Sequence, residues 1–510
     1  GHGLCRPDAR ASAMKQNGSF ASGFNTPLLK SRGSALFDEE QAPTLGVILS
    51  DREFYTGMLG LVNAMLGAAV LAYPFAVMST GTLGGTLLCA GIIAPLAATG
   101  VTVLMSSMRR CGATVAVRSY GDVVRVAFGA RLANAVDALI VVYSFGTCIG
   151  YLILLADVAT PFVMLGIGPG HDEMGVWRVV LSCVALVCFV LCTLRSLSAL
   201  KNAAVLGILA TVFIVLMLAQ QAVIAPCHLG DCADQMGRQG WCTPEQAEKT
   251  PATCNGELGV SLWPQGTSQL LGSLPLYAFA LQCHIQGAIV FTELPPRLRH
   301  DSATRMIAFS ATALMILLDM SVGLAGFLRF GAQTQGNVLK NFGATDILAN
   351  GARVCLGFSA LCSFPAQHFP ARLALYGFYA RARGKTSAEP TMTFIGAEAL
   401  TWVAIVSVFA QLVGSALAPV FQLVGAVCGS SVIFTLPGAI WLKLGPRDSA
   451  ARPLVGGLLM AGGLFILATG TTVTLQQILA KKPAVEDVLA VGGLTAGGDG
   501  DYSALFLSLL

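Results

Sequence analysis

The chain has 510 residues, of which 55% are hydrophobic and only 11% are charged, whereas an ordinary soluble domain carries about 25% charged residues. Apolar runs of about 20 residues recur along the chain, and each is long enough to cross a lipid bilayer. These properties exclude a soluble globular domain and indicate a helical membrane protein. The formal net charge of +4 does not indicate a nucleic-acid partner, because the positive charges lie in short loops between the apolar runs.

The two ends of the chain differ in composition from its middle. Residues 1–50 are polar, show no cleavable signal peptide and are expected to form a flexible cytosolic tail. A transmembrane domain is expected over residues 51–482, followed by a C-terminal tail over residues 483–510. The predicted fold class is an all-α membrane protein with about eleven spans. They cover roughly residues 54–78, 84–107, 133–157, 177–194, 203–224, 265–293, 306–330, 346–370, 392–413, 418–442 and 453–479.

Lysines and arginines gather on one side of the predicted membrane. If the N-terminus is cytosolic, the cytosolic segments hold most of the positive charge, and the opposite loops hold only Arg238, Lys249 and Lys340. Such a bias sets the orientation of a membrane protein. We therefore place the N-terminus in the cytosol and interpret most loop arginines as topology anchors. Eleven spans then put the C-terminus on the opposite side.

A long non-cytosolic loop is expected over residues 225–263. It contains Cys227, Cys232, Cys242 and Cys254, whereas the other 11 cysteines are scattered over the chain. Cysteines in a polar, non-cytosolic loop favour disulfides. We expect at least one disulfide among these four, and the three possible pairings stay open.

The first predicted span has the features of an interrupted helix. Residues 60–77 read GLVNAMLGAAVLAYPFAV, with the polar Asn63 at mid-depth and small residues at 67–69. Pro74 cannot donate a hydrogen bond to the carbonyl of Val70. Interrupted helices are found in secondary transporters, often at matching positions of two inverted repeats.

The sixth predicted span carries the second interruption. Residues 273–294 read SLPLYAFALQCHIQGAIVFTEL; Pro275 is expected to break the outer part, and Gly287 weakens the helix beyond the Gln-Cys-His run. Spans 1 and 6 begin two five-helix halves and enter the membrane from opposite sides, as an inverted repeat requires. At such breaks, free N–H groups bind carboxylates and free carbonyls bind ammonium groups or cations. The alternative, polar residues buried in ordinary helix packing, stays open.

These segments, with three others, resemble the amino acid/auxin permease family, nearest its sodium-coupled neutral amino-acid transporter branch. The resemblance runs in chain order from about residue 57 to 480. It is carried by NAMLGAAVLAYPFA (63–76), GYLILLADVATPF (150–162), LPLYAFALQCHIQGAIVFTEL (274–294), LRFGAQTQGNVLKNF (328–342) and SFPAQHFPARLAL (363–375).

The resemblance implies an eleven-helix transporter with a five-plus-five inverted repeat and discontinuous helices 1 and 6. It implies an amino-acid substrate, no cofactor, and Na⁺ or H⁺ as the coupling ion. A monomer in the lipid bilayer of a plasma membrane or a lysosome- or vacuole-like membrane is expected. The implied substrate-binding residues are Ala64, Gly67, Ala68, Ala69, Phe279, Leu281 and His284. The implied sodium-binding residues are Asn63 and Ser363; the freed carbonyls near Leu66 are expected to add ligands, and Ser359 is a candidate for a further one.

The chain departs from the family pattern at two places. Ala69 stands where the first-helix motif has its second glycine, and its methyl group narrows the approach of a ligand to the backbone. In the eighth helix, Leu361 and Ser363 stand where the sodium-coupled branch has two hydroxyl residues. Hard cations prefer oxygen ligands, so the loss of one hydroxyl weakens a sodium site unless Ser359, one turn earlier, replaces it.

Several ionisable residues lie inside predicted spans. Asp319 is near the middle of span 7, Glu398 is in span 9 and Arg353 is in the outer part of span 8. Charges within a membrane are costly and usually face the interior of the helix bundle. Asp319 and Glu398 are each interpreted either as a proton relay or as a structural hydrogen bond or ion pair. Arg353 is expected to brace the fold, and Asp157, at the outer end of span 3, to cap or gate it.

The leading hypothesis is a secondary active transporter for neutral amino acids, driven by sodium. A proton-coupled permease of the same family is the first alternative, and a membrane amino-acid sensor is the second. The sequence contains no acid/base or nucleophile constellation that would indicate an enzyme.

Overall fold

The computed structural model describes residues 44–80, 83–112, 117, 119–168, 170–194, 203–224, 266–384, 390–446 and 449–480. The four cysteines of the expected outer loop, Cys227, Cys232, Cys242 and Cys254, lie outside these residues, so the disulfide stays a prediction.

The elements of the described residues are all helical. The α-helices are α2 (Leu45–Ser50), α3 (Arg52–Met65), α4 (Tyr73–Thr80), α5 (Leu83–Gly112), α6 (Tyr120–Phe128), α7 (Ala130–Ile167), α8 (Glu173–Cys192), α9 (Ala203–Ile224), α12 (Thr267–Ala280), α13 (His284–Glu293), α14 (Asp301–Phe330), α15 (Ile347–Ala382), α16 (Met392–Val413), α17 (Leu417–Val424), α18 (Leu436–Leu444) and α19 (Ala451–Ala480). Short 3₁₀-helices are η1 (Ala68–Ala72), η4 (Pro296–Leu298), η5 (Gly331–Gln333) and η6 (Val338–Asn341). Two π-helical turns, η7 (Gly425–Gly429) and η8 (Ser431–Thr435), connect α17 to α18.

Within the described residues, ten helical stretches are long and apolar enough to span a membrane, and one bent pair makes an eleventh. The bent pair is span 1, which consists of α3, η1 and α4 and turns by 58°. Spans 2 to 5 are α5, α7, α8 and α9, span 6 is α12 with α13, and spans 7 to 9 are α14, α15 and α16. Span 10 runs from α17 to α18, and span 11 is α19. The prediction of eleven spans is confirmed.

Both predicted discontinuities exist. Span 1 leaves the α-helix after Met65, and span 6 is interrupted between Ala280 and His284. The prediction that Pro275 breaks span 6 was wrong, because this proline lies inside the continuous helix α12. Neighbouring helices tolerate a proline kink in a membrane helix, and here Gly425 and Gly470 leave room for spans 10 and 11 to pack directly on Pro275.

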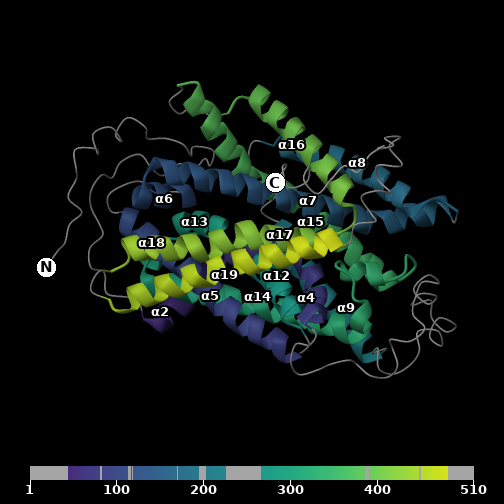
Figure 1. Ribbon diagram of the computed structural model, residues 1–510, viewed down its shortest axis with the longest axis horizontal. Helices are drawn as coiled ribbons and strands as arrows, with labels where there is room; N and C mark the ends of the chain where they lie inside the picture. Colours follow the sequence, from purple (N-terminus) through teal and green to yellow (C-terminus); the bar gives the residue numbers. More distant parts are fainter. Residues whose placement is uncertain are drawn as a thin grey trace.

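The spans form two packed groups that meet at the break of span 1. In the first group, which we call the bundle, α3 packs on α13, α12 packs on α4 and α5, and α14 packs on α3, α4 and α5. In the second, which we call the scaffold, α7, α8, α15 and α16 pack on one another. Figure 1 shows α7, α8 and α16 on one side of the molecule, while α18 and α19 run side by side across its middle.

Candidate substrate and ion site

A small cavity lies where the bundle meets the scaffold at the break of span 1. Its volume is about 10 Å³, close to the least that holds one water molecule. It receives residues from spans 1, 3, 5 and 8. They are Leu66, Gly67, Tyr151, Leu154, Gly207, Thr211, Leu356, Ser359, Ala360 and Ser363.

The span 1 side of the cavity is unwound backbone. Leu66 closes α3 through its N–H, which donates to the carbonyl of Val62 at 2.8 Å, and Gly67 is fully extended, with φ −150° and ψ −168°. The first N–H groups of η1 have no partner within their own helix. The segment therefore offers backbone donors and carbonyls to a ligand.

Tyr151 from α7 closes the cavity opposite Gly67. A Cβ atom at position 67 would lie 2.7 Å from the Tyr151 hydroxyl oxygen, so only glycine allows this approach. The sequence analysis quoted Tyr151 within a family motif but did not propose it as a site residue. A tyrosine in an apolar span is equally consistent with ordinary packing, so the close approach to Gly67 was the missing information.

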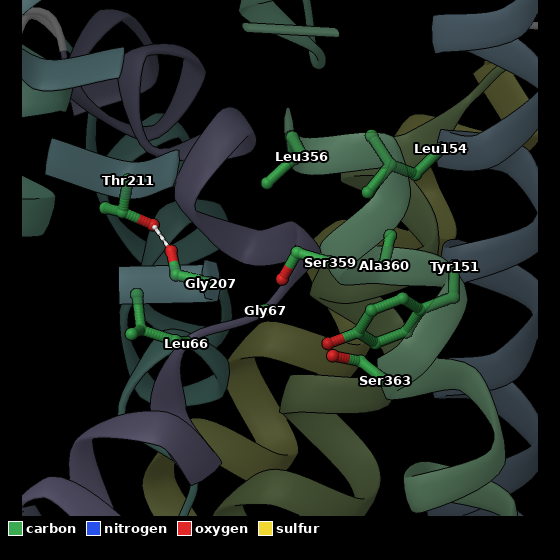
Figure 2. A pocket seen from close by; sticks show the side chains of 10 residues that line it. All are labelled: Leu66, Gly67, Tyr151, Leu154, Gly207, Thr211, Leu356, Ser359, Ala360 and Ser363. Atoms are coloured by element: carbon green, nitrogen blue, oxygen red, sulfur yellow. Dashed lines mark hydrogen bonds between the residues drawn. The ribbon is translucent and has the colours of Figure 1, made fainter. Parts of the chain in front are cut away.

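Span 8 contributes the hydroxyl side of the cavity. Ser359 and Ser363 are four residues apart and therefore share one face of α15. The Ser359 hydroxyl packs against span 5, since a Cβ at Gly207 would lie 2.9 Å from its oxygen. Figure 2 shows the hydroxyls of Ser359, Ser363 and Tyr151 turned toward the unwound segment that carries Gly67. The Thr211 hydroxyl donates to the Gly207 carbonyl at 3.1 Å.

The break of span 6 has a different setting. Phe279 stacks on Phe421 of span 10, with ring centroids 4.7 Å apart, and Leu281 is buried. Tyr143 donates from its hydroxyl to the Gln282 Oε1 atom at 2.9 Å. Neither Phe279 nor Leu281 is among the residues that line the cavity.

His284 also lies away from the cavity. Its side chain is fully buried between span 2 and span 10, where a Cβ at Gly100 would lie 2.7 Å from its Nε2 atom and against the Ile433 carbonyl. Its placement is that of a packed histidine at the first turn of α13. Because the ring faces span 2, contact with a ligand in the cavity would require movement of α13.

The other predicted site residues divide into two groups. Leu66, Gly67, Ser359 and Ser363 line the cavity together. Asn63 is exposed on α3, Ala64 is half-buried and Ala69 is buried; none of them lines the cavity. The structure describes the backbone of Ala68 at the start of η1.

Charged residues inside the scaffold are paired. Glu398 of span 9 is bonded to His368 Nε2 at 2.7 Å and accepts from Arg372 Nε at 3.3 Å. Arg372 also donates to the carbonyls of Cys192 and Leu194 at the end of α8. This network favours the structural interpretation of Glu398, because its carboxylate joins spans 4, 8 and 9.

Polar contacts also connect the non-cytosolic ends of the spans. Asp157 accepts hydrogen bonds from Trp177 at 2.9 Å and Asn337 at 3.2 Å, and lies 3.8 Å from the Lys340 ammonium group. The Arg353 guanidinium donates to the carbonyls of Leu339, Phe342 and Gly343. Both residues thus fasten the segment between spans 7 and 8.

Eleven spans, two of them interrupted, and a polar cavity at one interruption define an inverted-repeat secondary transporter. The sequence supports this class directly: residues 52–474 match the family described as "Transmembrane amino acid transporter protein". The chain belongs to this family and is a transporter, not an enzyme.

Individual relatives have low sequence identity to this chain, but their alignments cover most of its length. Vacuolar amino acid transporter 2 of Saccharomyces cerevisiae is 23% identical over 437 residues, which cover 82% of each chain. Sodium-coupled neutral amino acid transporter 7 of Homo sapiens is 23% identical over 426 residues, covering 80% of this chain and 83% of the relative. The family predicted from the five motifs is confirmed.

Solved structures agree on the fold. The Eremococcus coleocola manganese transporter has a TM-score of 0.51 and 13% identity, covering 86% of this chain and 92% of its own. MhsT in complex with L-phenylalanine has a TM-score of 0.50 and 13% identity, and the match covers 84% of this chain and 98% of the MhsT chain. The predicted five-plus-five inverted repeat is therefore confirmed, whereas substrate and ion are a separate question.

Proposed function

We propose that the protein is a secondary active transporter that moves neutral amino acids, coupled to sodium, across a plasma or vacuole-like membrane. The observation that carries the proposal is the cavity in which the unwound backbone at Leu66 and Gly67 meets the hydroxyls of Ser359 and Ser363. A free amino acid is larger than this cavity, so the bundle must move away from the scaffold to admit the substrate before span 1 closes on it.

The backbone of span 1 is proposed to hold the substrate's carboxylate and amine. Free N–H groups at the start of η1 match a carboxylate, and free carbonyls at the end of α3 match an ammonium group. The Tyr151 hydroxyl beside Gly67 is proposed as a further donor to the carboxylate. The lining has no charged side chain, and Leu154, Leu356 and Ala360 are apolar. A cationic substrate side chain would lack a counter-charge there, which favours neutral amino acids.

Sodium is proposed to bind on the span 8 side of the same cavity. Hard cations bind oxygen ligands, and Ser359, Ser363 and the carbonyls near Leu66 supply them. Ser359 thereby replaces the hydroxyl that the family pattern has at position 361. The name of one relative, sodium-coupled neutral amino acid transporter 7 of Homo sapiens, supports sodium as the coupling ion.

Uptake into proteoliposomes tests this function. Labelled alanine, glutamine and leucine should accumulate when an inward sodium gradient is imposed, and labelled arginine should not. The sodium is then replaced by choline at constant pH. Uptake that is indifferent to sodium and is abolished by a protonophore would replace the sodium assignment with proton coupling, and faster uptake of arginine would overturn the neutral substrate class.

A further inference from the structure

Asp319 lies at the centre of α14 and has no exposed surface. Neither of its carboxylate oxygens has a hydrogen-bond partner in the described part of the chain, and no cationic side chain described there forms an ion pair with it. An ionised carboxylate that is buried without a partner is so costly that such a group is neutralised instead. In this conformation Asp319 therefore carries a proton.

Asp319 lies on the helix that packs on the outer half of span 1. One turn further along α14, Gly323 lets Tyr73 approach so closely that a Cβ at position 323 would lie 2.9 Å from the Tyr73 ring. The Tyr73 hydroxyl is within electrostatic reach of Asp319 and, like it, is buried without a partner among the described residues. Two polar groups without partners among the described residues thus lie on α14 and on span 1, which pack on each other.

Other titratable groups near this pair are uncharged at neutral pH. Tyr277 of α12 packs edge-on against Tyr73, with ring centroids 5.1 Å apart, and Cys89 of α5 lies close to both tyrosines. Helix α9, which also packs on α14, has no titratable residue. The remaining titratable groups on α14 and on the helices α3 and α5 that pack against it lie near the helix ends: Arg52, Glu53, Tyr55, Arg109, Arg110, Cys111, Asp301, Arg305 and Arg329.

A chain of hydroxyls leads from Tyr277, whose ring packs against Tyr73, to the end of α4. The Tyr277 hydroxyl donates to Thr86 Oγ1 at 3.4 Å, and the Thr86 and Thr80 hydroxyls are 2.7 Å apart. Thr80 is the last residue of α4. By the charge bias of the loops, this end of span 1 is the non-cytosolic one. Hydroxyl groups both donate and accept, so they can pass a proton inward from that side.

The surroundings suit a proton better than a metal ion. A hard cation needs several converging oxygens, whereas no described oxygen forms a hydrogen bond with the Asp319 carboxyl, and the hydroxyls of Thr80 and Thr86 are already bonded to each other. The cavity at the break of span 1 does not include Asp319, and no metal-binding group of three acidic, histidine or cysteine residues exists among the described residues. A proton needs neither a cavity nor additional ligands.

We propose that Asp319 is a proton-binding site, distinct from the substrate and sodium cavity, which is filled when the outer half of span 1 closes on α14 and is emptied when that half moves away. The proposal rests on the proposed transport function, since it links the proton to the closure that substrate binding drives. Closure buries the carboxyl and takes up a proton; opening lets water reach the carboxyl and release it.

If this proposal holds, proton uptake and substrate affinity are linked. If substrate binding from outside closes the outer half of span 1 on α14, binding takes up as much as one proton. The dissociation constant for substrate then falls as pH falls, by at most about tenfold per pH unit for one linked proton. Asp319→Asn replaces the carboxyl with a neutral amide of similar size, so closure no longer requires a proton.

The test uses the purified full-length protein at saturating sodium. Proton uptake on addition of alanine or glutamine is measured with a pH indicator in weak buffer, and the dissociation constant is measured from pH 5.5 to 8.5. We expect up to one proton and a pH-dependent constant for the wild type, and neither for Asp319→Asn. Asp301→Asn, on the same helix but half-exposed at its cytosolic end, is the matched control and should behave like the wild type.

Infrared spectroscopy separates this proposal from the proposed function. The carbonyl stretch of a buried protonated carboxyl should be present in the wild-type protein and absent in Asp319→Asn, whether or not an amino acid binds. Absence of substrate binding with this band present refutes the transport function but not the protonated site. Tyr73→Phe, which keeps the carboxyl, should shift the pH dependence without abolishing it. Wild-type proton uptake in Asp319→Asn, or an unchanged infrared band, overturns the proposal.

Discussion

Glu398 and Asp319 are both carboxyl groups buried within spans, and their surroundings are opposite. In the scaffold, Glu398 is bonded to His368 and Arg372, which also binds the end of α8. In the bundle, Asp319 has no partner among the described residues and lies on α14, which packs on the outer half of span 1. The Glu398 carboxylate, paired across three spans, holds these spans together. The Asp319 carboxyl has no such partner, so its protonation can change with conformation. The substrate cavity lies between these two regions.

Removing one partner from the scaffold network should have the largest effect on stability. Arg372→Ala leaves the buried Glu398 without its arginine partner and frees two carbonyls at the end of α8. Breaking a buried ion pair in this way costs roughly 3–5 kcal/mol. We expect a marked fall in the thermal unfolding midpoint of the purified protein in detergent.

Arg381→Ala is the matched control for this prediction. Arg381 is on the same helix, but 42% of its side chain is exposed and its contact with Asp137 is 3.9 Å long. Pairs of this kind contribute little, so the unfolding midpoint should hardly move. Equal losses in the two variants would contradict the distinction between the scaffold network and an ordinary surface charge.

The boundary between the two regions is tested by Gly67→Ala. The added methyl group would lie 2.7 Å from the Tyr151 hydroxyl, and overpacking of this kind costs about 1–3 kcal/mol. Because the strain arises only where span 1 closes on span 3, substrate affinity should fall roughly tenfold to a hundredfold, as measured by the concentration dependence of uptake.

A second substitution distinguishes steric strain from a lost backbone contact. Tyr151→Phe removes the oxygen nearest to the added methyl, so Gly67→Ala combined with Tyr151→Phe should recover part of the affinity lost in Gly67→Ala. If the double variant is as weak as the sum of the two single effects predicts, Tyr151 does not close against Gly67 in the substrate-bound state.

These contrasts also show what the sequence could and could not predict. Hydropathy was sufficient for the eleven spans, because a bilayer sets their length, and the polar Asn63, the small residues at 67–69 and Pro74 indicated the break of span 1. The prediction from Pro275 was wrong, because a proline interrupts a membrane helix only if the neighbouring helices leave the freed backbone groups without hydrogen-bond partners. Glu398 and Asp319 were indistinguishable in sequence: the partners of Glu398, His368 and Arg372, come from another span.

The proposed ion site gives a smaller effect within the same boundary. Ser363→Ala removes a hydroxyl oxygen from the cavity, and polar contacts with a charged group contribute about 1.5–3 kcal/mol. We therefore expect the sodium concentration for half-maximal uptake to rise at least about tenfold, with maximal uptake less affected. Cys362→Ala, the adjacent residue off that face, is the control.

Substitution of Asn63 tests whether the sodium-binding pattern of the family applies to this chain. Its side chain is exposed on α3 and does not line the cavity, whereas Ser359 does. We expect Ser359→Ala to raise the half-maximal sodium concentration more than Asn63→Ala does. The reverse order would mean that α3 rotates to bring Asn63 into the site when sodium binds.

A third carboxylate, Asp51, completes the comparison at the cytosolic ends of spans 1 and 6, where the effect should be smallest. Asp51 accepts from Arg297 Nε at 2.6 Å and from Nη2 at 3.1 Å, and this hydrogen bond lowers the pKa of Asp51 below its usual value. Because the folded pKa is depressed, the pair stabilises the protein above the unfolded pKa, near 4, and this stabilisation is lost as pH falls through the folded pKa. Arg297 is exposed, and an exposed ion pair contributes little. Arg297→Ala should therefore lower the unfolding midpoint only slightly at pH 7, and by less as pH falls through the folded pKa of Asp51. A large loss at pH 7 would show that this pair, like the Glu398 network, holds two spans together.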